Sequence, residues 1–371
     1  MKKRVLFIMH MPPPVHGAAM MGQYIHDSKL INETFECCYV NPSLSNNVAN
    51  VGKVSLGKII FMLKNIVYIV RLAKAFKPDI IYFTSTAGGW ATIRDWAVVM
   101  LLKRRKRPIV LHIHNKGVKK FSDKHPLARI AYKGLFGKSK VILLAKELYP
   151  DIQQYVSADD VYYCPNGMPV TSQPDFERTA TNDPYTFLFL SNMIREKGVI
   201  DVLKACAVLK NKGIKFQCNF VGKWSTVSEE EFYALVTKLN IEHEINYLGA
   251  KYGVDKVEAL QQADALAFPT YYPGETFGLV LLEAMEYAMP CISTFEGGIP
   301  SVVDDGKDGF LIKSRDVEAL ADKMEWLANH LEEGLKMGEH GRNRFSELFT
   351  LTTFEHRIHE ILCSETNSSQ K

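Results

Sequence analysis

Two of the glutamates, Glu275 and Glu283, are separated by seven residues in a stretch that is otherwise largely apolar, YYPGETFGLVLLEAMEYAMP at 271–290. A carboxylate in apolar surroundings costs free energy unless a hydrogen-bond donor satisfies it. The two side chains therefore either reach water from an ordinary helix or belong to a polar binding site. This stretch alone favours neither interpretation.

The local pattern predicts where the two carboxylates lie. An apolar run at 265–270 predicts a strand and the run at 276–288 predicts a helix, so Glu275 falls in the loop between them and Glu283 about two turns into the helix. Backbone amides at the positive end of this helix are suited to an anion, and they belong to Phe277, Gly278 and Leu279. One carboxylate could accept sugar hydroxyls and the other the vicinal hydroxyls of a ribose. This arrangement would grip a nucleotide sugar.

Cations follow an earlier strand of the same half. The loop after the predicted strand at 185–191 carries Arg195 and Lys197. Such groups suit a diphosphate leaving group, although in isolation a solvated loop charge is the simpler explanation. The sequence has no D-x-D triplet and no C-x-x-C pair. We therefore expect no metal at the diphosphate and no cofactor besides the nucleotide-diphosphate sugar itself.

Small residues open the first predicted helix. Gly17 and Ala18 lie within MPPPVHGAAMMGQYI (11–25), directly after the predicted strand at 4–10. A turn of small residues lets backbone N–H groups approach a phosphate or sugar at a helix N-terminus. The stretch lacks the G-x-G-x-x-G pattern, and a tight strand-to-helix turn would use the same residues.

His114 is the candidate side chain of the first half. It ends the apolar run PIVLHIH at 108–114, where strand alternation places it on the same side as His112. A lone histidine is more often structural than catalytic. Because ligands of doubly wound folds bind beyond the carboxyl ends of strands, its position makes His114 the better functional candidate. Metal binding by the pair would need a further ligand, which the neighbouring sequence does not offer.

Apolar strands that alternate with helices organise both halves. Continuous apolar runs favour parallel sheets covered on both faces, so the fold class is α/β with two doubly wound domains. The length of 371 residues favours two domains, and a linker rich in Pro, Thr, Asn and Asp at 165–184 separates 1–168 from 169–349. We expect only the tail at 364–371 to be disordered. The remaining predicted strands are 79–85, 140–146, 215–222, 244–249 and 290–295.

Charge distinguishes the two halves. Residues 1–170 hold 25 Lys and Arg against 10 Asp and Glu, whereas the rest hold 20 against 31. A basic first half could face nucleic acid, anionic lipid or an anionic acceptor, but no nucleic-acid motif accompanies it. The apolar helix predicted at 53–77 is interrupted by Lys64 and Arg71, so it is no membrane span. Two compatible interpretations remain for this segment. It is a core helix of the first domain, or it offers a face for peripheral contact with anionic membrane, assisted by KRRKR (103–107).

The compartment expected from the sequence is the cytoplasm. The seven cysteines are scattered and form no disulfide framework, and MKKRVLFIMH is followed by PPP too early for a secretory signal. Contact with anionic lipid would place the protein at the inner face of the plasma membrane.

Taken in order, these motifs resemble retaining GT-B glycosyltransferases of glycosyltransferase family 4, of the bacterial polysaccharide-biosynthesis type. The resemblance covers nearly the whole chain. It rests on E-x7-E within PGETFGLVLLEAMEYAMP, on GGIPSVVDDGKDGFL (297–311), PNG (165–167), REKG (195–198) and ADALAFPT (263–270). It implies two Rossmann-like domains facing a cleft, with a final helix at about 350–363 that returns to the first domain.

The resemblance also implies roles for single residues. Glu275 would contact the donor sugar, Glu283 the ribose and Lys197 the diphosphate. His114 would lie near the acceptor and the transferred sugar, and Gly17 matches the glycine-rich first loop. The catalytic set is thus Glu275, His114 and Lys197. The donor-binding set is Gly17, Ala18, Asn192, Arg195, Lys197, Thr276, Phe277, Gly278, Leu279 and Glu283.

Four residues depart from the family pattern. Ser191 and Asn192 stand where Gly-Arg is usual, so a second phosphate-binding cation is missing there, and Arg195 is one candidate to replace it. Ser301 stands where glutamate is common, and Ala288 where glycine is common. These changes affect the expected geometry around the donor more than the reaction class.

The expected reaction is metal-independent, retaining transfer of a hexose from a nucleotide-diphosphate sugar to a lipid-linked or surface-polysaccharide acceptor. Two alternatives use the same donor half. One is a GT-B-type sugar-nucleotide epimerase, and the other is a non-catalytic sugar-nucleotide-binding partner of a membrane complex. Nucleic acid is not an expected partner.

Overall fold

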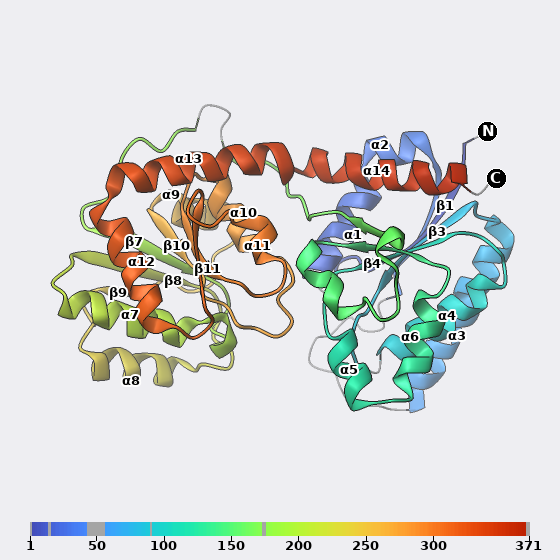
Figure 1. Ribbon diagram of the computed structural model, residues 1–371, viewed down its shortest axis with the longest axis horizontal. Coiled ribbons are helices and arrows are strands. Elements are labelled where there is room, and N and C mark those ends of the chain that lie inside the picture. Colours follow the sequence, from blue (N-terminus) through green and yellow to red (C-terminus); the bar gives the residue numbers. More distant parts are fainter. Residues whose placement is uncertain (1, 14–15, 43–55, 90, 173–175, 369–371) are drawn as a thin grey trace. The chain divides into compact units, whose positions relative to one another are not determined.

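The computed structural model describes residues 2–13, 16–42, 56–89, 91–172 and 176–368. The chain divides into two compact units (Figure 1). Unit 1 comprises residues 1–167 and 351–371, and unit 2 comprises residues 168–350. No helix among the described residues is long and apolar enough to cross a membrane.

Unit 1 is built on a parallel sheet of six strands in the order β2-β1-β3-β4-β5-β6. The strands are β1 (Arg4–Ile8), β2 (Glu36–Val40), β3 (Ile80–Ser85), β4 (Ile109–Ile113), β5 (Lys140–Leu143) and β6 (Val161–Tyr163). The central strands β3 and β4 are buried at every position, because helices cover both faces of the sheet. The strand order reverses between β1 and β3.

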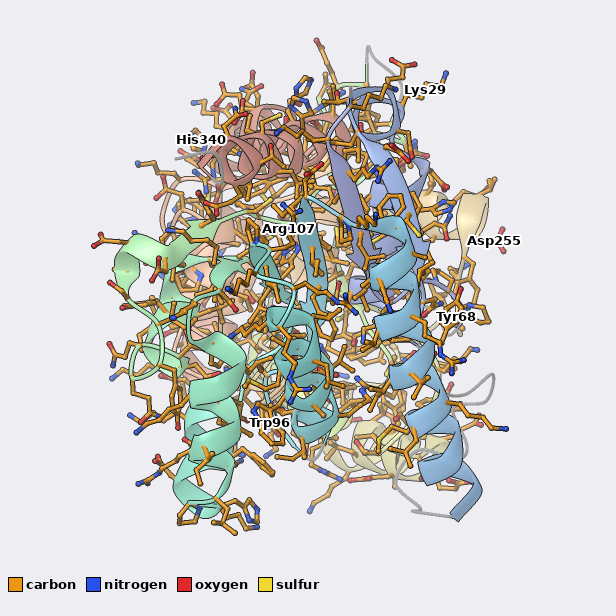
Figure 2. All side chains as sticks on the ribbon, turned by 90° about the vertical axis from the view of Figure 1, so that its right-hand side faces the viewer. Lys29, Tyr68, Trp96, Arg107, Asp255 and His340 are labelled. Carbon is orange, nitrogen blue, oxygen red and sulfur yellow. The ribbon has the colours of Figure 1, made fainter. Side chains whose placement is uncertain are left out.

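The helices of unit 1 form a layer on each face of its sheet (Figures 1 and 2). One layer packs onto the sheet through a shared apolar core and consists of α1 (Gly17–Asp27), α2 (Lys29–Thr34) and α14 (Leu351–Ser368). The other consists of α3 (Leu56–Phe76), α4 (Ala91–Lys103) and α6 (Ala128–Phe136), with α4 packed between its two neighbours. Shorter helices are α5 (Val118–Lys124), η2 (Lys146–Asp151) and η3 (Ala158–Asp160).

Unit 2 repeats the plan with a second parallel sheet, in the order β12-β11-β10-β7-β8-β9. Its strands are β7 (Tyr185–Leu190), β8 (Phe216–Val221), β9 (Ile245–Tyr247), β10 (Ala265–Ala267), β11 (Cys291–Thr294) and β12 (Gly309–Ile312). One face packs on α7 (Val199–Asn211), α8 (Glu229–Leu239) and α12 (Val317–Asn329). The remaining helices are η4 (Arg195–Lys197), α9 (Gly253–Gln261), α10 (Leu279–Glu286), α11 (Ile299–Val302) and α13 (Leu331–Leu348).

The sequence missed three strands, β2, β6 and β12. β2 and β6 are largely half-buried or exposed, so they lack the apolar continuity that marks a central strand. β12 has four residues and follows a polar turn. All three lie at or next to a sheet edge.

One predicted helix is confirmed, and the expected disorder of the tail needs correction. The helix predicted at 53–77 is α3, Leu56–Phe76, and residues 53–55 lie outside the described part of the chain. The tail predicted to be disordered from residue 364 instead continues α14 to Ser368. Its Glu365 is only 7% exposed and accepts a hydrogen bond from the Tyr162 hydroxyl at 2.6 Å. This contact with β6 holds residues whose polar composition suggests disorder.

Candidate functional site

The strand order of unit 2 reverses between β7 and β10, which lie side by side in the middle of the sheet. In open parallel sheets, ligands bind beyond the carboxyl ends of the strands at such a reversal. The REKG loop follows β7, and the loop with Glu275 follows β10. The topology therefore brings two motifs from distant parts of the sequence to one binding edge.

Lys197 and Glu275 form an ion pair at this edge. Lys197 Nζ lies 2.5 Å from Glu275 Oε2, and the two side chains are 17% and 10% exposed. Lys197 Nζ also lies 5.3 Å from the ring centroid of Phe268 and 4.8 Å from that of Tyr272. Two aromatic faces and a carboxylate therefore fix the ammonium group in a partly dehydrated position.

The loops after β7 and β10 are held against each other by backbone contacts. Tyr271 N donates to Glu196 O at 2.7 Å. Gly198 has φ +93°, and a Cβ there would lie 2.6 Å from Pro269 O. Only glycine accepts both that φ angle and that approach without strain. The glycine of REKG thus lets Lys197 reach the loop that carries Glu275.

A third loop, after β11, supports Glu275 from behind. Gly297 has φ +58°, and a Cβ there would lie 2.3 Å from Glu275 O. The next residue, Gly298, donates its N–H to Thr276 O at 3.0 Å. The glycine pair of the GGIP motif is therefore explained by close packing against the backbone at Glu275 and Thr276.

Helix α10 begins at Leu279, later than predicted, because Gly278 takes a left-handed conformation with φ +76°. No side chain caps this helix end, so its first amides remain available to an anion from the ligand edge. The Phe277 ring is buried and lies 6.0 Å from that of Phe349, which leaves only its backbone near the site. Glu283 is the fifth residue of α10, so it lies one turn into the helix and not two.

Glu283 has a partner that the sequence did not suggest. Lys256 Nζ of α9 lies 2.9 Å from Glu283 Oε1, with the two side chains 33% and 18% exposed. Both residues line a hollow of about 450 Å³ within unit 2. Its other walls include Val254 and Val257 of α9. An apolar hollow with a charged pair on its wall is suited to a nucleoside.

Glu286, the third carboxylate of the stretch, has a structural role. It is 1% exposed and accepts hydrogen bonds from Ser172 N at 2.6 Å and from both the N and the hydroxyl of Thr171. It therefore fixes the incoming chain of unit 2 to α10. Each glutamate of the apolar stretch has a donor partner, which is how the buried run tolerates three carboxylates.

Asn192 and Arg195, the residues considered for the usual phosphate-binding arginine, each have a partner in this unit. Asn192 is exposed and its Oδ1 accepts a hydrogen bond from Lys223 N at 3.2 Å. Arg195 forms an exposed ion pair with Glu231 of α8. Lys223, which follows β8 and extends over the Tyr252 ring at 5.7 Å, is a cation of this edge that sequence reasoning missed. A lysine directly after the apolar run FVG was the available signal.

In unit 1, Gly17 and Ala18 are the first two residues of α1. His16 caps this helix, because its Nδ1 accepts a hydrogen bond from Ala19 N at 3.3 Å. Farther along, Gly22 meets the backbone two residues after β1, where a Cβ would lie 2.0 Å from His10 O. The missing side chain at Gly22 thus lets α1 pack closely against the backbone that follows β1.

Histidines gather at the same edge of unit 1. The rings of His112 and His114 lie 4.0 Å apart, as strand alternation predicts, and His112 Nδ1 is hydrogen-bonded to the Tyr82 hydroxyl. Burial, followed by the charges of His10 and His16, lowers the pKa of His114 to about 3. Burial also lowers the pKa of His10 to about 4. These imidazoles are neutral near pH 7, so they can donate or accept hydrogen bonds without carrying charge.

The described residues contain no group of three or more His, Cys, Asp or Glu side chains placed to hold a metal ion.

The family comparison matches the second unit. Residues 172–344 match the family described as glycosyl transferases group 1. The chain is 30% identical over 168 residues to the D-rhamnosyltransferase WbpZ of Pseudomonas aeruginosa, covering 45% of this chain and 42% of that protein. It is 26% identical over 174 residues to the capsular polysaccharide biosynthesis glycosyltransferase CapM of Staphylococcus aureus, covering 46% and 43%. The chain thus spans less than half the length of these curated relatives.

A comparison of structures covers both units. The crystal structure of Anabaena HepE in complex with UDP matches 98% of this chain and 100% of its own, with a TM-score of 0.73 and 17% identity. At this identity the likeness shows the fold. The fold class predicted from the sequence, a GT-B arrangement of two Rossmann-like domains, is confirmed.

Proposed function

We propose that this GT-B chain, whose residues 172–344 match the glycosyl transferases group 1 family, is a retaining glycosyltransferase that uses a nucleotide-diphosphate sugar. The observation that carries the proposal is the Lys197–Glu275 pair at the strand reversal of unit 2. A cation for a diphosphate and a carboxylate for sugar hydroxyls lie there within one hydrogen bond of each other. The relatives WbpZ and CapM support the same class of activity.

The donor would lie along the carboxyl edge of this sheet. Its nucleoside would enter the hollow beside Glu283, with the ribose hydroxyls donating to that carboxylate. Its diphosphate would meet Lys197 and the first amides of α10. Thr276, Phe277, Gly278 and Leu279 then contribute backbone groups. The UDP complex of HepE supports a nucleotide ligand by analogy of fold alone.

Transfer would proceed through an oxocarbenium-like transition state in which negative charge builds up on the leaving diphosphate. Lys197 would stabilise that charge in a site where Phe268 and Tyr272 already shield the ammonium group from part of the surrounding water. Glu275 would orient the sugar through its hydroxyls. We propose that no metal and no further cofactor takes part, since the sequence lacks a D-x-D triplet and cations and helix amides can neutralise the leaving group.

The proposed acceptor is a glycan or a lipid-linked glycan. The protein would transfer a hexose to this acceptor in the cytoplasm. His114, together with the start of α1 at Gly17 and Ala18, would meet the acceptor and the transferred sugar from unit 1. The basic composition of residues 1–170 supports an anionic lipid-linked acceptor, reached by peripheral contact with the inner face of the plasma membrane.

The proposal is tested first by ligand binding and then by transfer. A ligand that binds the native state raises apparent stability, so a thermal-shift panel of nucleoside diphosphates and their sugars should identify the donor. With that donor and an acceptor extract, NMR of the product should show that the anomeric configuration is kept. Interconversion of the nucleotide sugar without acceptor would favour the epimerase, and binding without turnover would favour the non-catalytic partner.

Metal independence has its own test. Addition of EDTA should leave the transfer rate within about twofold, because Lys197 and the α10 amides supply the positive charge that a metal would supply. Complete loss of transfer in EDTA, restored by manganese or magnesium, would contradict this part of the proposal.

A further inference from the structure

The outer side of α3 presents apolar side chains to solvent. Leu63, Val67 and Tyr68 are 53%, 47% and 55% exposed. Leu63 and Val67, four residues apart, are neighbours on the helix surface, and all three line one shallow hollow together with Lys64 and Arg71. The inner side packs onto unit 1 through three buried side chains, Ile66, Ile69 and Ala73. The core-helix interpretation of this segment is therefore confirmed, and it accounts for one side of the helix only.

Positive charge surrounds these apolar side chains. The α3 sequence contains no acidic residue, and Lys64, Arg71 and Lys74 are exposed on it. The turn that follows α4, residues 104–107, adds the sequence RRKR, which is exposed at every position. Helices α3 and α4 both run from the carboxyl edge of the sheet back to the start of the next strand. Their last turns therefore both lie at the edge where the strands begin. Figure 2 shows Tyr68 and Arg107 on this layer of helices.

Lys103, the first residue of the basic run, is used inside the fold. Its Nζ donates to the carbonyl of Gly134 at 2.7 Å and to that of Leu135 at 2.9 Å, and it also reaches Gly137. It therefore caps the carboxyl end of α6 and fixes this helix to α4. The cations available for a partner are those at 104–107. We call residues 63–74 of α3 together with 104–107 the α3 face.

We propose that the α3 face docks on the surface of an anionic lipid bilayer. Its cations would contact lipid phosphates, while Leu63, Val67 and Tyr68 enter the headgroup region, where apolar and aromatic side chains gain by leaving water. A nucleic acid would attract the same cations but gives no reason for an exposed Leu and Val among them. The inference deepens the acceptor part of the proposed function, on which it rests, and it is tested by binding alone.

Co-sedimentation with vesicles tests the docking. The full chain should pellet with vesicles of phosphatidylcholine and phosphatidylglycerol at low salt, but not with phosphatidylcholine alone. High salt should release it, because exposed charges are screened within about 10 Å at 0.1 M ionic strength. Equal recovery with both kinds of vesicle would overturn the proposal.

Variants locate the surface. Two triple variants should each weaken the partition more than about tenfold. The first, Lys64→Gln with Arg71→Gln and Arg105→Gln, removes three cations, and one basic residue near the bilayer contributes about fivefold. The second, Leu63→Ser with Val67→Ser and Tyr68→Ser, removes the apolar area that would enter the headgroup region. Matched controls come from unit 2. They are Tyr233→Ser with Leu331→Ser, which are 45% and 42% exposed, and the exposed set Lys215→Gln, Lys238→Gln and Lys336→Gln. Equal losses in the controls would overturn the assignment.

Two further readouts separate docking from misfolding and from polyanion binding. Hydrogen exchange of the unmodified chain should slow in α3 when anionic vesicles are added, while α8 stays unchanged. An oligonucleotide arm addresses the other polyanion. Binding of the oligonucleotide as strong as that of the vesicles, and unaffected by the three serine substitutions, would show that the surface serves nucleic acid and would overturn the proposal. Transfer to a detergent-soluble acceptor should persist in the α3 variants, so failure of docking and failure of catalysis are distinguishable.

Discussion

The ammonium of Lys197 and the carboxylate of Glu275 are bound to each other at 2.5 Å, although the sequence assigns one to the diphosphate and the other to the sugar of a donor. A donor bound here as proposed would therefore enter a pair that already exists. Its phosphate would share the ammonium group and its hydroxyls would share the carboxylate. In the proposed donor site, this pair would order both groups before the donor arrives and so lower the cost of orienting them during transfer.

We expect Lys197→Met to lower kcat of transfer by about 10²–10³-fold, because it removes the cation from the leaving group. Glu275→Gln keeps the shape and should lower kcat by at least about tenfold, since a hydrogen bond to a charged group contributes roughly 1.5–3 kcal/mol. Steady-state kinetics of each single variant and of the double variant complete a cycle. Because the two groups act on one transition state, the double loss should be smaller than the product of the single losses. Wild-type rates in both single variants would contradict the site.

Lys223→Gln tests the other cation of this edge. If Lys223 replaces the arginine that the family has at Asn192, donor affinity should fall about tenfold, as expected for one lost charge-assisted hydrogen bond. Arg195→Gln is the matched control, because Arg195 is already paired with Glu231. Donor binding measured by calorimetry decides between them. A larger loss in the Arg195 variant would restore the original sequence interpretation.

Glu283→Ala should weaken nucleotide binding about tenfold or more while leaving kcat at saturating donor within a few-fold, because the ribose lies away from the reacting bond. Lys256→Met leaves the carboxylate in place but removes its partner, so it should have a smaller effect on affinity than Glu283→Ala. Calorimetry with the nucleoside diphosphate alone measures both. An equal loss in the two variants would show that the ion pair itself binds the nucleotide. Affinity unchanged in the Glu283 variant would contradict the assignment of the hollow.

How far the sequence could predict this site depends on whether a signal is local. Continuous apolar runs mark buried parallel strands, so 185–191 and 265–270 were found and their following loops contained Lys197 and Glu275. That the two residues meet, 78 positions apart, depends on β7 and β10 being neighbours. No local pattern reports strand order, so the pair could not be predicted from spacing.

Lys256 and Glu286 were missed for a related reason. Each is a charged residue on a helix, which from sequence looks like an ordinary solvated side chain. Only the packing of α9 against α10 gives Lys256 its partner, and only the return of the chain at Thr171 buries Glu286. The start of α10 was misplaced because Gly278 can continue a helix or stop one, and its left-handed φ is set by the packed loops around it.

The last prediction concerns the support of the Glu275 loop. Asp308 is buried, and its carboxylate lies 2.9 Å from Arg344 Nε and accepts a hydrogen bond from Asp304 N at 2.6 Å. The same guanidinium donates to Ser301 O and Val302 O at 3.1 Å, so the pair ties α13 to α11 behind the GGIP loop. Burial raises the pKa of Asp308 to about 6 even though Arg344 opposes the shift.

A pKa raised in the folded state means that the folded protein binds the proton more tightly than the unfolded chain. The stabilisation from protonated Asp308 is therefore largest below about pH 4, where it amounts to at most roughly 3 kcal/mol. It is lost as the pH rises through about 6. Asp308→Asn removes this titration, so the stability of the variant relative to the wild type should increase between about pH 4 and about pH 7. Urea unfolding of both proteins across this range measures the difference. Asp322→Asn, at an exposed position, serves as the control. If the difference in free energy of unfolding between wild type and the Asp308 variant stays constant with pH, Asp308 is charged throughout this range and the attraction of Arg344 outweighs the effect of burial.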